Sequence, residues 1–196
     1  DRTKPKITGV EDSVYYNSDV TPVIEEDNIQ NITVKFNDKK LTSYKAGDTL
    51  TKEGVYQIRV SDKAGNKIGY ITFTIDKTVP EAEVTKSNND KSTNEDVVVT
   101  IKANEPISMS EDWNKISDTT YQKIYSENGK YKALITDKAG NQTNVSFEVK
   151  RIDKVAPEAE VIKSNNDQPI NKDVVVTIKA NEAIYKPEGW TEVKTN

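Results

Sequence analysis

The sequence contains no cysteine and no histidine among its 196 residues. Their absence excludes Ser-His-Asp and Cys-His nucleophiles, zinc sites built from these side chains, and disulfide bridges. Acidic residues are abundant, but no motif singles out a carboxylate pair of the kind that hydrolyses glycosides. We therefore predict that the chain is not an enzyme, and we nominate no catalytic and no cofactor-binding residue.

Long apolar runs and blocks of basic residues are also missing. No segment approaches the roughly 20 apolar residues that a membrane-spanning helix requires. The net charge is −4, from 28 Lys and Arg against 32 Asp and Glu, and no basic cluster favours nucleic acid or an anionic membrane surface. We predict neither as a partner. Because the sequence begins at Asp1 without a signal peptide and ends within a repeat, we expect a segment of a larger protein, with its neighbouring domains as partners.

What the sequence does contain is an internal repeat. Residues 80–113 align with residues 157–190 without a gap, and 24 of these 34 positions are identical. The segment Asp-Lys-Ala-Gly-Asn stands at 62–66 and returns at 137–141, 75 residues later (137 − 62). This spacing is the length of one small β-domain, so it predicts a tandem array. The predicted domains are residues 1–76, residues 77–153, and residues 154–196 as the front part of a third repeat.

Apolar and polar residues alternate with a period of two through several short segments. No segment shows a sustained apolar stripe with the 3.6-residue period of a helix. Strands of this length, separated by turn residues in domains of this size, predict an all-β fold of tandem sandwiches. The segments in question are 32–36, 56–60, 71–75, 97–103, 131–135 and 145–149.

The boundaries between the predicted domains each contain a proline and no glycine. They read Ile-Asp-Lys-Thr-Val-Pro at 75–80 and Ile-Asp-Lys-Val-Ala-Pro at 152–157. Proline fixes its own φ and restricts the preceding residue, so we expect short, stiff joints and an extended rod. Segment 154–196 lacks the later strands of the repeat, and we expect it to be poorly ordered by itself or to borrow pairing from another chain.

The first repeat resembles the bacterial Ig-like domains that occur in tandem on Gram-positive surface proteins. The resemblance rests on the segments Ile-Thr-Gly-Val at 7–10, Val-Thr-Pro at 20–22, Leu-Thr-Lys-Glu-Gly-Val-Tyr at 50–56, Asp-Lys-Ala-Gly-Asn at 62–66 and Phe-Thr-Ile-Asp at 73–76. The second repeat departs from this pattern in its first half and matches again over residues 129–141. The resemblance implies tandem Ig-like β-sandwiches and an extracellular location, secreted or attached to the cell wall. A chain without cysteine suits that setting.

Two tyrosines and two turns have structural interpretations. Tyr56 and Tyr131 stand where Ig sandwiches place a tyrosine whose hydroxyl bonds back to the main chain, with Ile58 and Ala133 at the usual cysteine positions. The two Asp-Lys-Ala-Gly-Asn segments are interpreted as the turn between the last two strands. Asn104 and Glu105 are interpreted as a solvated strand end.

Acidic residues near the joints raise the alternative of calcium between the domains, which would stiffen the rod. No Asp-x-Asp-x-Asp loop orders these oxygens, although calcium requires about 6–8 oxygen ligands. The metal candidates are Asp76, Glu81, Asp153 and Glu158, with Glu83 and Glu160 beside them. A Lys–Asn cross-link of the kind found in some Gram-positive Ig-like domains stays open, since no triplet marks it.

Trp113 and its counterpart Trp190 are interpreted as core residues, by analogy with the tryptophan on strand C of Ig domains. The alternative is an exposed ring that stacks on sugar, with Tyr121 and Tyr125 extending the platform. These three residues, Trp113, Tyr121 and Tyr125, are the ligand-binding candidates.

These patterns favour a non-catalytic structural or adhesive segment, a stalk or spacer, of a bacterial cell-surface or secreted protein. A binding module for a host glycoprotein or polysaccharide is the alternative. A further alternative is an accessory spacer of a secreted enzyme that degrades carbohydrate or protein.

Overall fold

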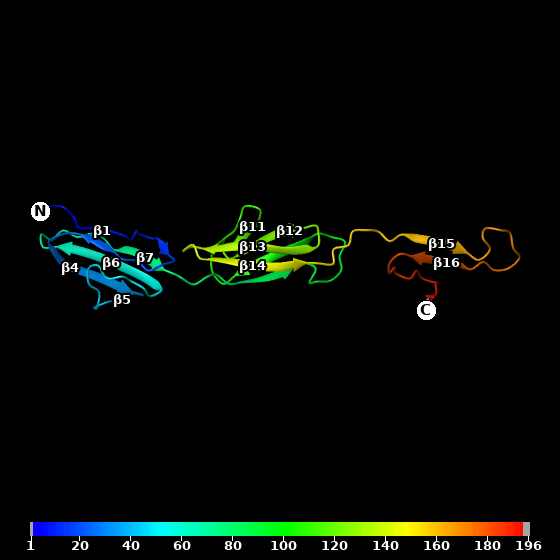
Figure 1. Ribbon diagram of the computed structural model, residues 1–196, viewed down its shortest axis with the longest axis horizontal. Coiled ribbons are helices and arrows are strands. Elements are labelled where there is room, and N and C mark those ends of the chain that lie inside the picture. The colour runs from blue at the N-terminus through cyan, green and yellow to red at the C-terminus, as the bar shows by residue number, and fades with distance from the viewer. Residues whose placement is uncertain (1, 194–196) are drawn as a thin grey trace.

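The computed structural model describes residues 2–193 of the chain, and every regular element within them is a strand. Two sandwiches and a two-stranded hairpin follow one another along the long axis of the molecule (Figure 1). The all-β prediction is confirmed, and each alternating segment named above forms or lies within a strand. None of the described residues belongs to a helix that is long and apolar enough to cross a membrane.

The first repeat consists of a two-stranded and a five-stranded sheet. The small sheet pairs β1 (Lys6–Thr8) with β3 (Val23–Glu25). The large sheet has the order β2-β7-β6-β4-β5, and only the pair β2–β7 is parallel. Its strands are β2 (Tyr15–Tyr16), β4 (Ile29–Phe36), β5 (Lys39–Lys40), β6 (Gly54–Asp62) and β7 (Ile71–Ile75).

The second repeat has a four-stranded and a three-stranded sheet, with all strands antiparallel. The order β11-β12-β9-β8 corresponds to strands D, E, B and A of an Ig sandwich, and β10-β13-β14 corresponds to C, F and G. The strands are β8 (Ala82–Lys86), β9 (Val97–Ala103), β10 (Ile107–Ser108), β11 (Asn114–Ser117), β12 (Thr120–Tyr125), β13 (Gly129–Asp137) and β14 (Gln142–Val149).

The third repeat contains one antiparallel pair, β15 (Ala159–Lys163) and β16 (Val176–Ala180). These strands are the counterparts of β8 and β9 in the second repeat. The sequence contains no counterpart of β12, β13 or β14 for this repeat. Val174 and Val176 are therefore about 40% exposed, whereas Val97 and Val99 are fully buried.

Each complete sandwich has its own apolar core, made by the inward-facing residues of both sheets. In the second repeat Val97, Val99 and Ile101 of one sheet pack with Ala133 and Ile135 of the other. The first repeat has an equivalent cluster around Ile58, Val60 and Phe73. Burial of these side chains is the main source of stability for each sandwich, at about 25 cal/mol per Å² of apolar surface removed from water.

The tyrosine prediction is confirmed in both repeats. The Tyr56 hydroxyl donates to the carbonyl of Lys52 at 3.0 Å, and the Tyr131 hydroxyl donates to the carbonyl of Glu127 at 3.1 Å. In both cases the acceptor lies four residues upstream, in the connection that leads into strand F.

Candidate cation site at the joint between the first two repeats

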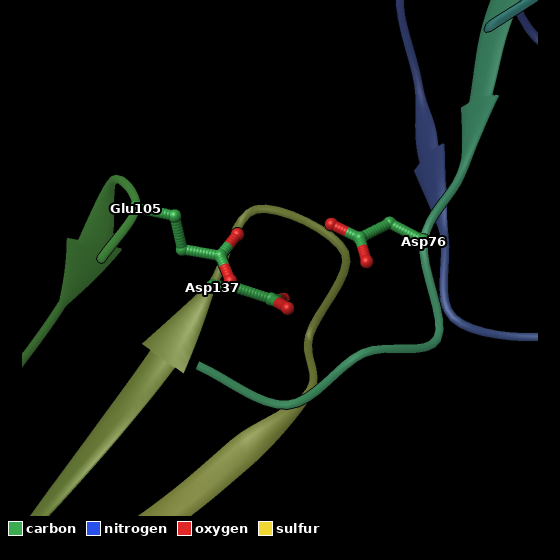
Figure 2. Close-up of side chains that lie close together, drawn as sticks. All are labelled: Asp76, Glu105 and Asp137. Carbon is green, nitrogen blue, oxygen red and sulfur yellow. The ribbon is translucent and has the colours of Figure 1, made fainter. Parts of the chain in front are cut away.

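Three carboxylates from two different repeats meet at the first joint. Asp76 follows β7, Glu105 lies between β9 and β10, and Asp137 is the last residue of β13. One carboxylate oxygen from each lies within 4.8 Å of the others. Figure 2 shows Asp76 pointing from the end of the first sandwich toward Glu105 and Asp137 of the second.

The position of Asp137 follows from the turn that it begins. Its two carboxylate oxygens accept the backbone N–H and the side-chain amide of Asn141, each at 2.8 Å. Asp62 and Asn66 repeat the same two bonds at the same distances. The turn prediction is confirmed, and the glycines within these turns, Gly65 and Gly140, have φ values of +89° and +93° that favour glycine.

Asn141 also connects the two repeats. Its side-chain amide donates to the backbone carbonyl of Asp76 at 2.9 Å, across the joint. Close by, the Lys138 ammonium lies 5.6 Å from the ring centroid of Tyr15. The turn of the second repeat is therefore in direct contact with the end of the first.

The site carries uncompensated negative charge. Asp137 is buried, and Glu105 and Asp76 are half-buried. Burial raises the pKa of Glu105, and the neighbouring charges of Asp76 and Asp137 raise this pKa further. Among residues 2–193, no Lys or Arg forms an ion pair with any of the three.

The donor set fits a hard cation of the calcium type. Three carboxylates supply oxygen ligands, and calcium binds such oxygens in flexible geometry with water completing the shell. Some of this capacity is already used, because Asp137 accepts from Asn141 and Asp76 accepts from the N–H of Thr78 at 3.2 Å. The chain has no cysteine or histidine, so it offers no thiolate or imidazole ligand for other metals.

Of the metal candidates, the structure brings Asp76 into this cluster and leaves the others apart. Glu81 and Glu158 are exposed, and their backbone N–H groups donate to the side-chain oxygens of Asn104 and Asn181 at 3.0 Å. Asp153 is exposed and accepts the N–H of Val155 at 3.1 Å. The neighbouring residues Glu83 and Glu160 are exposed as well.

Sequence reasoning missed Glu105 and Asp137 as members of the site. The sequence identifies Asp137 only as a turn residue. The interpretation of Asn104 and Glu105 as a solvated strand end holds for Asn104, which is exposed, and is wrong for Glu105. Asn104 bonds Glu81 at both its backbone N–H and its side chain, and Glu105 is half-buried against the joint. Three features of the sequence could have indicated the site. They are an acid at the joint, an Asn-Glu pair after strand B, and an Asp at the end of strand F.

The three ligand-binding candidates lie inside the second sandwich. Trp113, Tyr121 and Tyr125 are only 6%, 6% and 8% exposed. The core interpretation of Trp113 is confirmed, but the residue lies on the connection just before β11 and not on strand C. Its ring packs edge-on against Tyr125 and Phe147, with centroids 6.5 and 6.2 Å away. These rings present no aromatic platform to solvent.

At both joints, a linker lysine forms an ion pair with an aspartate of the preceding sandwich. Lys77 forms an ion pair with Asp19 at 2.9 Å, and Lys154 forms one with Asp96 at 2.5 Å. The two lysines are 77 residues apart in the sequence, and so are the two aspartates (154 − 77 and 96 − 19), which is the repeat length. Lys77 additionally donates to the carbonyl of Thr51 at 2.7 Å.

A Lys–Asn cross-link finds no support in this arrangement. Such a bond requires a lysine held inside the core beside an acid. Within residues 2–193, the buried charged or polar side chains are Asp62 and Asp137, and no lysine is buried.

Comparison with known proteins gives one related sequence and several distant structural likenesses. The chain is 32% identical over 103 residues to an outer cell wall protein of Brevibacillus brevis, a match that covers 53% of this chain and 10% of that protein. No protein-family model matches the chain.

Among solved structures, the fibronectin(III)-like modules of Clostridium thermocellum CbhA share 13% identity, with a TM-score of 0.35, over 76% of this chain and 95% of that one. An I-band fragment of titin shares 14% identity, with a TM-score of 0.35, over 76% of this chain and 66% of that one. A glucan-utilisation protein of Bacteroides ovatus was solved with a mixed-linkage heptasaccharide. It shares 12% identity, with a TM-score of 0.28, over 76% of this chain and 48% of that one. At these scores the fold assignment rests on the sheets of the chain itself.

Proposed function

We propose that the chain is a non-catalytic stalk or spacer in a bacterial cell-surface or secreted protein. The observation that carries this proposal is the repeated tie at the joints, where the linker lysine bonds back to an aspartate of the preceding sandwich. A joint that is bonded to its own domain and contains proline restricts the angles between neighbouring domains. A spacer has to keep its length, and this construction supports that role.

The proposed location, at the cell surface or secreted, is supported by the related sequence. The matched protein is named as an outer cell wall protein, and the match spans the larger part of this chain. Because only a tenth of that protein is covered, its own activity and assembly do not transfer to this chain.

We also propose that the first joint binds a calcium-type cation through Asp76, Glu105 and Asp137. The proximity of their oxygens supports this, as does the absence of any Lys or Arg ion pair to them within residues 2–193. Thermal unfolding with calcium and with chelator tests it, since a cation that binds the folded joint raises the melting temperature. Equal melting temperatures in the two conditions would contradict the proposed cation site and would leave the spacer proposal unaffected.

The spacer role is tested by measuring a distance across the first joint. The chain has no cysteine, so Lys39→Cys with Asn144→Cys places one spin label on an exposed site of each sandwich. Pulsed electron paramagnetic resonance should give one narrow distance distribution. A broad distribution, comparable with that of a Gly/Ser-linked pair of the same sandwiches, would contradict a length-keeping role.

A further inference from the structure

Within residues 2–193, part of one sheet edge of the second sandwich has no neighbouring strand. β13 pairs with β14 over residues 129–136, but it pairs with β10 only at residues 136 and 137. In the first repeat the equivalent strand β6 pairs with β4 over residues 56–62. The same edge is therefore covered in one repeat and open in the other.

The edge is open because the chain leaves it early. After β10 the backbone turns, and the N–H of Trp113 donates to the carbonyl of Ser110 at 3.1 Å. Asn114 already pairs with Gln122 of the opposite sheet. The residues that would have extended β10 along β13 instead cross over to form β11.

The alternation of hydrogen-bonded pairs along β13 and β14 shows which main-chain groups face this edge. The N–H of Asp137 donates to the carbonyl of Asn141 at 3.0 Å, which makes them a bonded pair of the β13–β14 ladder. Bonded pairs alternate along an antiparallel ladder. The N–H and C=O groups of Lys130, Lys132 and Leu134 therefore point away from β14, toward the open edge. Such a row of main-chain groups is a template for one more strand.

The side chains along this edge define the chemistry of a partner. Lys130 and Lys132 are exposed, and neither forms an ion pair with another described residue. Leu134 is 45% exposed, and Glu148 stands opposite Lys130 across the β13–β14 pair. Lysines on an edge repel another lysine-bearing strand, but they attract an acidic one.

We propose that residues 129–135 of β13 bind an extended acidic peptide segment by strand addition. In the antiparallel orientation an apolar residue of the segment faces Leu134, and acids at the second and fourth positions after it face Lys132 and Lys130. The recognised pattern is apolar–x–acid–x–acid. This surface goes beyond a spacer role, because it gives β13 a binding edge that β4 covers on the equivalent strand of the first repeat.

Hydrogen exchange on the full chain tests the proposal. The probe is the peptide acetyl-Thr-Leu-Val-Glu-Val-Glu-Thr-amide, and the control peptide replaces both Glu residues with Lys. The acidic peptide should slow exchange at the amides of Lys130, Lys132 and Leu134, and the basic peptide should not. No protection at millimolar acidic peptide, or equal protection by both peptides, would overturn the proposal.

Two variants separate the charge from the strand pairing. Lys130→Glu with Lys132→Glu should weaken binding of the acidic peptide by about tenfold or more and allow the basic peptide to bind. The matched control, Lys63→Glu with Lys67→Glu in the first repeat, should leave binding unchanged. Lys132→Pro removes an edge N–H that does not take part in the β14 ladder, so it should abolish binding while the amides of β9 keep their protection from exchange. Acidic-peptide binding that survives Lys132→Pro would show a charge contact without strand addition and would also overturn the proposal.

Discussion

Asn141 joins two roles in one side chain, because it closes the last turn of the second sandwich and also bonds the carbonyl of Asp76 across the joint. Asn141→Ala leaves the buried Asp137 carboxylate without its side-chain donor. Loss of a partner for a buried polar group costs about 1–3 kcal/mol. We expect the second repeat to lose stability by that amount, measured by native-state hydrogen exchange at the buried amides of β9. Asn144→Ala, an exposed asparagine three residues on, should change nothing, and an equal loss there would contradict this account.

Glu105 predicts a pH dependence opposite in sign to that of Asp62, Asp90 and Asp112, whose pKa values are lowered chiefly by side-chain hydrogen bonds. Its pKa is raised in the folded protein by burial and then by Asp76 and Asp137, so folding disfavours its ionised form. The resulting destabilisation is present above the folded pKa and is relieved as the pH falls toward the ordinary carboxyl value. Glu105→Gln should therefore stabilise the cation-free protein at pH 7 by roughly 0.5–1 kcal/mol.

This advantage of the Gln variant should shrink as the pH is lowered and should vanish below about pH 4, near the ordinary pKa of glutamate. Melting temperatures of both proteins across this range, in the presence of chelator, measure it. Added calcium should reverse the order, since the variant loses one ligand of the cation. A difference between the two proteins that stays constant with pH would mean that the charge of Glu105 is not the cause.

At the scale of the element, the chain places one identical segment in two different structural settings. Ten residues, 96–105, recur unchanged at 173–182. In the second repeat this segment forms β9 in the centre of a sheet, and Ile101 is fully buried. In the third repeat it forms β16, with β15 on one side and no other paired strand among residues 2–193.

We expect identical sequences to exchange their amides at very different rates. Residues 97–101 should be protected to the level of global unfolding of the second repeat, whereas residues 174–178 should exchange through local opening. Mass-resolved hydrogen exchange on a dilute, monomeric sample measures both segments together. Equal protection would contradict the expectation that the third repeat depends on outside pairing, and protection that rises with concentration would show pairing between chains.

The same pair of elements explains how far the sequence could predict the structure. Strict alternation in β9, and tyrosines at the third residue of β6 and of β13, identify strands because they report local periodicity and local bonds. The cluster of Asp76, Glu105 and Asp137 could not be derived in this way, because it depends on how one sandwich meets the next. Likewise, nothing local distinguishes Trp113 on the connection to β11 from a tryptophan on strand C.

At the scale of the whole molecule, the two joints differ in what surrounds them. The first joint has a linker bonded to the preceding sandwich and a following turn that contacts it through Asn141 and Lys138. The second joint keeps the ion pair between Lys154 and Asp96, but the sequence has no third copy of the Asp-Lys-Ala-Gly-Asn turn to meet it. Among the residues that the structure describes, the first joint is thus contacted from both sides, whereas the bonds to the second joint come from the preceding sandwich.

This difference leads to a prediction about Lys77, which bonds both Asp19 and the carbonyl of Thr51. Exposed ion pairs contribute about 0.2–1 kcal/mol, so Lys77→Ala should leave both sandwiches folded and act on the angles between them. With spin labels at positions 39 and 144, the variant should broaden the distance distribution across the first joint. Lys154→Ala removes the equivalent lysine of the other joint and should leave this distance unchanged. If Lys77→Ala also leaves it unchanged, the contacts through the 137–141 turn hold the joint without the lysine, and combining Lys77→Ala with Asn141→Ala should then release it.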